Sequence, residues 1–71
     1  MAINAVTKKK KIEDPYELAA LRAMAKTALQ LIEMNDLEDA MFIINDLRDI
    51  IKIYDVEDIE YIKKLRELGY L

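Results

Sequence analysis

The sequence contains no cysteine, histidine, serine or tryptophan. The lack of cysteine excludes both disulfide bonds and thiolate metal sites as sources of stability. Nucleophilic triads and dyads of the usual kinds need serine, cysteine or histidine, so that chemistry is excluded too. Carboxylate pairs remain, but acid–base catalysis by carboxylates needs a pocket that raises one pKa, and 71 residues leave little room for one. We therefore predict that the chain is not an enzyme by itself, carries no cofactor and has no small-molecule substrate.

Long apolar runs are also missing, because no stretch approaches the ~20 residues that a membrane-spanning helix requires. The mildly apolar start, Met1 to Thr7, is followed by lysines, which reverses the order found in a secretory signal. We predict no membrane contact and a cytoplasmic location, or a virion or host-cytoplasm location if the protein is viral. Charged residues make up 35% of the chain and there is one glycine, a composition that also fits a thermophile.

Positive charge is scarce outside one short segment. Four of the 11 basic residues form the run Lys8, Lys9, Lys10 and Lys11, so the seven that remain from residue 12 onward face 14 acidic residues. The body of the protein therefore carries a net charge of −7, against −3 for the whole chain. An acidic body of this kind repels nucleic acid at neutral pH.

Helix signals divide the rest of the chain into three segments. Asp14 is placed to cap a helix whose first position is Pro15, where the missing N–H costs nothing. Asn35 tolerates the left-handed conformation that ends many helices, and Asp36 can cap the next helix. Asp55 repeats this arrangement, with Tyr54 and Ile59 spaced for a hydrophobic staple. The signals predict helices over residues 15–34, 37–54 and 56–68.

The single glycine, Gly69, predicts where the third helix ends. Leu65 and Tyr70 stand on either side of it at the spacing of a Schellman closure. Because the connections are short, neighbouring helices must fold back antiparallel. No segment carries a strand pattern. The expected fold is all-α: a small three-helix up-down-up bundle forming one domain over residues 13–71, preceded by a flexible lysine-rich arm over residues 1–12.

The helices carry more apolar surface than one small bundle can cover. The second has one unbroken apolar stripe, yet Phe42 and Ile53 project from its opposite face and Ile43 and Ile50 widen the stripe on one flank. The alanine-rich first helix is apolar over most of its circumference and is predicted to be buried on two sides. We expect these faces to pack into a homo- or hetero-oligomeric helical assembly through the following interface residues: Met24, Leu31, Phe42, Ile43, Ile50 and Ile53.

Acidic residues gather at the turns, in two groups: Asp36, Glu38 and Asp39, and Asp55, Glu57 and Asp58. Carboxylates of this kind are possible oxygen ligands for Ca²⁺ or Mg²⁺. They also stand where capping and the helix dipole favour negative charge, and neither group has the twelve-residue loop and loop glycine of a calcium site. We therefore interpret them as helix caps and predict no metal site.

The four lysines have three interpretations: a solvated tail, a contact to the phosphates of DNA or RNA, or a docking segment for an acidic protein surface. No aromatic or arginine is interleaved with them, so base stacking and bidentate base recognition have no support. Two functions remain open. The first is a small interaction module that binds itself or another protein, as an accessory subunit, adaptor or inhibitor. The alternative is a nucleic-acid-associated protein that uses Lys8, Lys9, Lys10 and Lys11, with the helical body as its dimerisation unit.

Overall fold

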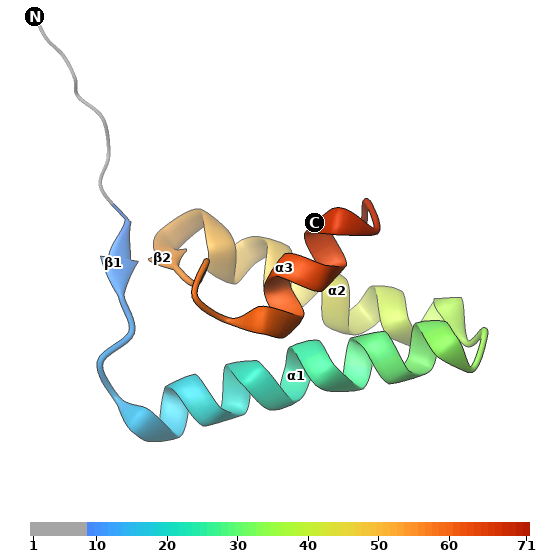
Figure 1. The fold of residues 1–71 in the computed structure, drawn as a ribbon, viewed down its shortest axis with the longest axis horizontal. Helices are drawn as coiled ribbons and strands as arrows, with labels where there is room; N and C mark the ends of the chain where they lie inside the picture. The colour runs from blue at the N-terminus through green and yellow to red at the C-terminus, as the bar shows by residue number, and fades with distance from the viewer. Residues whose placement is uncertain (1–8) are drawn as a thin grey trace, which may run out of the picture.

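The structure, a computed structural model, describes residues 9–71 and confirms the small all-α bundle (Figure 1). Helix α1 (Pro15–Glu33) and helix α2 (Leu37–Ile53) run side by side in opposite directions, and the shorter α3 (Glu60–Glu67) packs against them. Two-residue strands β1 (Lys10–Lys11) and β2 (Tyr54–Asp55) complete the elements. Residues 1–8, which make up most of the predicted arm, lie outside the described part of the chain.

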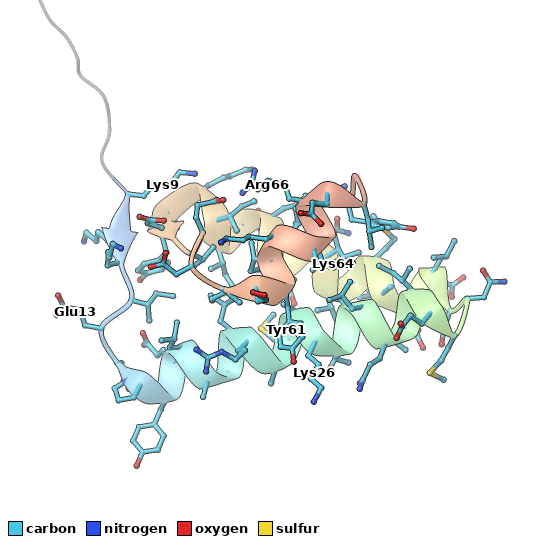
Figure 2. All side chains as sticks on the ribbon, viewed as in Figure 1. Lys9, Glu13, Lys26, Tyr61, Lys64 and Arg66 are labelled. Atoms are coloured by element: carbon cyan, nitrogen blue, oxygen red, sulfur yellow. The ribbon has the colours of Figure 1, made fainter. Side chains whose placement is uncertain are left out.

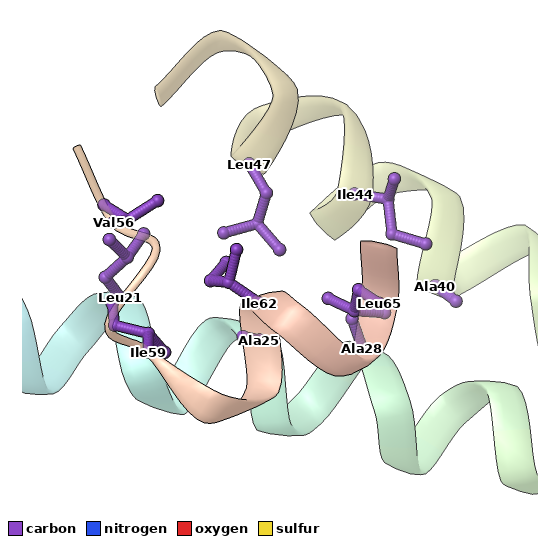
Figure 3. Close-up of a cluster of buried hydrophobic side chains, with 10 residues drawn as sticks. All are labelled: Leu21, Ala25, Ala28, Ala40, Ile44, Leu47, Val56, Ile59, Ile62 and Leu65. Atoms are coloured by element: carbon purple, nitrogen blue, oxygen red, sulfur yellow. The ribbon is translucent and has the colours of Figure 1, made fainter. Parts of the chain in front are cut away.

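All three helices contribute to one core, and every buried side chain in the described chain is apolar. Figure 3 shows Ile62 of α3 directed toward Leu47 of α2, with Leu65 next to Ile44. Alanines on α1 and α2 allow these larger side chains to fit between the helices. The core consists of Leu21, Ala25, Ala28, Ala40, Ile44, Leu47, Val56, Ile59, Ile62 and Leu65.

Both ends of α1 follow the predicted local signals. The Asp14 carboxylate accepts a hydrogen bond from the Tyr16 N–H at 2.8 Å, and Pro15 occupies the first helical position. At the other end, Asn35 has a φ of 63° and the Asp36 N–H donates to the Leu31 carbonyl at 2.8 Å. This closure satisfies carbonyl groups that the helix leaves free, so the turn into α2 is tight and the two helices are antiparallel.

The predicted start of α3 is wrong. We expected a helix from residue 56 capped by Asp55, but α3 begins at Glu60 and its cap position, Ile59, has no side-chain hydrogen bond. Residues 56–59 instead form a turn in which the Ile59 N–H donates to the Val56 carbonyl at 3.0 Å. The physical reason is burial: Val56 and Ile59 both lie in the core, and burial of their apolar side chains outweighs the weak local preference for a capped helix start.

The predicted end of α3 is confirmed. Gly69 has a φ of 90°, a conformation that is unfavourable for a residue with a Cβ atom. The Tyr70 N–H donates to the Leu65 carbonyl at 2.9 Å, which completes the expected Schellman closure. As a result the last two residues fold back and pack against the core.

The strand pair was not predicted. Lys10 lies opposite Tyr54, and Lys11 lies opposite Asp55, in a parallel arrangement that joins the end of the lysine segment to the end of α2. A pair of only two residues has no alternating pattern that sequence reasoning can detect. The final residues of the predicted arm are therefore placed against the helical body.

Candidate protein interface

Helix α3 covers one side of the α1–α2 hairpin. An open groove of about 810 Å³ lies between α1 and α3, with Lys26, Leu29 and Glu33 on its α1 wall. Figure 2 shows Tyr61 of α3 reaching toward α1 near Lys26. On the α2 side, Arg48 donates to the Tyr70 carbonyl at 3.3 Å. Positions 26, 29, 33 and 48 therefore mark the flank of the hairpin that α3 and the C-terminal residues cover.

Four of the predicted interface residues lie on the opposite, uncovered flank of the hairpin. At 3.6 residues per turn, Met24 and Leu31 of α1 are on the far side of the helix from Leu29 and Glu33. By the same geometry, Ile43 and Ile50 of α2 are on the far side from Arg48, and because the helices are antiparallel these four side chains share one face. All four are partly buried at the edge of the core. We call this group the open face.

The other two predicted interface residues are much more exposed. Phe42 is 68% exposed and Ile53 is 57% exposed, and both lie on the outer side of α2, away from the core. Asp46 and Asp49 stand on the same side of the helix. Phe42 is therefore a large apolar side chain bordered by carboxylates, and we call Phe42 and Ile53 the outer edge of α2.

Sequence reasoning missed a second exposed stripe, on α1 and its C-cap. Tyr16 is 85% exposed and Met34 is 72% exposed, although we had assigned neither to the interface. They are the two ends of a run with 4-3-4-3-4 spacing, which places its members on one side of the helix. That spacing was present in the sequence, but it is less apolar than the core stripe of the same helix, because it includes Thr27 and Gln30. The run, which we call the α1 stripe, consists of Tyr16, Ala20, Ala23, Thr27, Gln30 and Met34, all exposed.

The two exposed surfaces differ in charge. The α1 stripe contains no Asp, Glu, Lys or Arg, and the charged Lys26 and Glu33 of the same helix line the groove toward α3. The outer part of α2 is acidic, with Glu38, Asp39, Asp46 and Asp49. Within this acidic part, hydrogen bonding to the Asp36 carboxylate, followed by the charge of that carboxylate, raises the pKa of Asp39 above its ordinary value.

The acidic groups at the turns act as caps and ion-pair partners. Asp36 accepts a hydrogen bond from the Asp39 N–H at 3.4 Å, as predicted for a cap of α2. Asp55 accepts from the Glu57 N–H at 3.3 Å, so it caps the turn before α3 and not the helix. The Glu57 carboxylate is 2.7 Å from the Arg66 guanidinium. Residues 9–71 contain no group of three or more side chains placed to hold a metal ion.

The structure describes three of the four residues of the lysine run. Lys8 lies outside the described residues, and Lys9 is exposed. Lys10 and Lys11 form β1, and the Lys11 ammonium is 3.5 Å from Asp58 and 3.9 Å from Asp55. The end of the basic segment is thus paired with the acidic turn of its own chain. Exposed ion pairs of this kind contribute about 0–1 kcal/mol, so the contact is weak.

Replacing Lys11 by glutamate should weaken the β1–β2 pair. The substitution places a carboxylate beside Asp55 and Asp58, and like charges at this distance repel. We expect faster amide hydrogen exchange at residues 10–11 and 54–55 with a stability loss below about 1 kcal/mol. The difference should shrink in 1 M salt, where the Debye length is about 3 Å. Lys11→Gln is the matched neutral variant, and identical exchange in all three proteins would show that the charge contact does not hold the pair.

The groove between α1 and α3 is poorly suited to binding a small ligand. Its lining alternates in charge, with three lysines and three glutamates around a few apolar side chains, and it contains no buried polar group. Ligand pockets normally enclose most of the ligand and present a small number of convergent polar groups. The lining consists of Lys26, Leu29, Gln30, Ile32, Glu33, Glu60, Tyr61, Lys63, Lys64, Glu67 and Leu68.

Comparison of the chain with protein-family models, with curated proteins and with solved structures gives no match. Within residues 9–71, no helix combines the length and the apolar character needed to cross a membrane.

Proposed function

We propose that this protein acts by binding other protein chains through the apolar surfaces of its α1–α2 hairpin, as an accessory subunit, adaptor or inhibitor within a larger assembly. One observation carries the proposal: α3 covers a single flank of the hairpin, and large apolar side chains remain exposed on the rest of it. The proposed partner is a second copy of the chain, another protein, or both.

The arrangement at the outer edge of α2 resembles the anatomy of known interfaces. Energetically dominant interface residues are often aromatic, and a polar rim around them excludes water. Phe42 is the only phenylalanine of the chain, and Asp46 and Asp49 supply such a rim. Single exposed apolar residues are ordinary on protein surfaces. Here Phe42 and Ile53 share one side of α2, and the half-buried Ile43 and Ile50 adjoin them.

The nucleic-acid alternative gains no specific support. Lys11 is paired with Asp58 and Asp55, and the acidic body repels phosphate. Of the four lysines that the alternative needs, Lys8 lies outside the described residues.

Phe42→Asp should strongly weaken partner binding without unfolding the protein, because the side chain is exposed and the helix tolerates Asp at a cost of at most about 0.7 kcal/mol. The test is crosslinking of the tagged full-length chain in its native cells, followed by identification of the crosslinked chains, including further copies of itself. Loss of a hot-spot aromatic costs about 2 kcal/mol or more, which is roughly a 30-fold loss of affinity.

Asp46→Asn is the matched control, since it lies on the same side of α2 one turn away. It should retain the crosslinked chains that Phe42→Asp loses. If both variants and the original protein give the same crosslinked chains, the outer edge of α2 is not a binding surface and the proposal is wrong for that edge.

A further inference from the structure

The α1 stripe has the spacing of a helix that packs against another helix. Its positions alternate at intervals of four and three residues, the seven-residue pattern that keeps a seam facing a partner helix in coiled coils. The stripe is exposed along the whole helix, which is about 28 Å long for 19 residues. Its large side chains, Tyr16 and Met34, are at the two ends and are among the most exposed apolar residues described. Between them lie Gln30 and three small residues, Ala20, Ala23 and Thr27, which let a second helix approach closely.

Charge indicates which partner fits this stripe. Around the axis of a two-fold dimer each residue meets its own copy, so a charge near the axis meets an equal charge and repels it. The α1 stripe has no charged residue and satisfies this condition. The outer part of α2 fails it, because a symmetric contact there would bring Asp39 and Asp46 close to their own copies. Of these two exposed surfaces, only the α1 stripe can therefore lie at the axis if a second copy binds.

The distribution of side-chain size favours an antiparallel arrangement. With the axis between Ala23 and Thr27, Tyr16 of one copy lies beside Met34 of the other, and Ala23 lies beside Thr27. Small residues then meet in the middle, while an aromatic ring and a thioether close each end, a contact that is favourable in itself. A parallel pair would place ring against ring and thioether against thioether, and would align the two helix dipoles unfavourably.

We propose that a second copy of this chain packs antiparallel against the α1 stripe and forms a two-fold symmetric dimer. This inference rests on the proposed function and deepens it by assigning an occupant to one of the apolar surfaces. In the dimer the two outer edges of α2 point away from the axis, so Phe42 and Ile53 of both copies stay available to a different partner. The dimer therefore presents two copies of the outer edge of α2 to a different partner.

The first test is sedimentation velocity on the full-length chain at tens of micromolar, with Ala23→Glu as the disrupting variant. Two glutamates near the axis repel each other, so we expect a dimer for the original protein and at least a tenfold weaker dimer for Ala23→Glu. Ala19→Glu makes the same change at an exposed position of α1 beside the stripe, and it should sediment close to the original protein. Circular dichroism checks that both variants keep their helix content.

The second test reads the orientation by disulfide formation, because the natural chain has no cysteine to interfere. Tyr16→Cys and Met34→Cys proteins, mixed and oxidised, should form the mixed disulfide in preference to either symmetric one. A strictly monomeric original protein would overturn the inference, as would preferential Tyr16→Cys homodimers or equal weakening by Ala19→Glu. None of these results bears on the outer edge of α2, whose role is judged separately by the Phe42→Asp crosslinking.

Discussion

Replacing Ile62 by alanine is expected to lower the free energy of unfolding by about 2–5 kcal/mol, the usual cost of truncating a buried isoleucine. Ile62 is one of the four largest side chains that are fully buried. It holds the eight-residue α3 against the hairpin beside Leu47, and α3 has no side-chain cap at its N-terminus to support it independently. A cavity at this position therefore removes much of what keeps α3 in place.

The expected loss is large compared with the total free energy of unfolding of a chain of this length. Domains have about 0.05–0.15 kcal/mol of stability per residue, which gives about 4–11 kcal/mol for a chain of this length. Urea unfolding followed by circular dichroism measures the difference, at one fixed protein concentration because self-association makes stability depend on concentration. Leu68→Ala is the matched control in the turn that follows α3, where the leucine is 50% exposed. Equal midpoints for the two variants would show that α3 does not depend on Ile62.

Asp14→Ala should cost about 1 kcal/mol, and Asp55→Ala should cost less. Sequence alone gave the two aspartates the same role, but only Asp14 caps a helix, through its 2.8 Å bond to the Tyr16 N–H. Truncating a capping aspartate typically costs about 0.5–2 kcal/mol. Asp55 accepts a longer bond of 3.3 Å from the Glu57 N–H within a turn, and its approach to Lys11 is exposed.

Asn is the matched replacement, because asparagine caps helices about as well as aspartate. Asp14→Asn should therefore retain most of the stability that Asp14→Ala loses, as measured by the same urea titration. If Asp55→Ala proved more destabilising than Asp14→Ala, the turn at residues 56–59 would be holding the fold together more strongly than the start of α1 does.

The ends of α1 and α2 were predictable because their signals are local. Asp14 with Pro15, and Asn35 with Asp36, act through hydrogen bonds to backbone groups a few residues away. Such contacts form with little dependence on the rest of the fold, so the residue types alone indicate them. The Gly69 closure belongs to the same class, since its left-handed conformation follows from the absence of a side chain.

The start of α3 and the strand pair were not predictable, because non-local contacts decide them. Residues 56–59 carry the same capping signals as the other helix starts, yet the chain there must reach across the hairpin and bury Val56 and Ile59. The pairing of Lys10 and Lys11 with Tyr54 and Asp55 joins segments that are more than 40 residues apart. A weak local preference yields when burial of apolar side chains favours another path.

The sequence by itself determined that this protein is a small helical bundle with an acidic body and more apolar helix surface than it can cover. Periodicity and composition are enough for that conclusion, because each helix displays its faces whatever its neighbours are. Only the tertiary structure decided which surfaces stay exposed. Helix α3 packs on the flank marked by Leu29 and Arg48, and by occupying that side it leaves the open face, the α1 stripe and Phe42 uncovered. The reason is physical: a helix with two apolar flanks is compatible with a neighbour on either, and only packing among all three helices selects one.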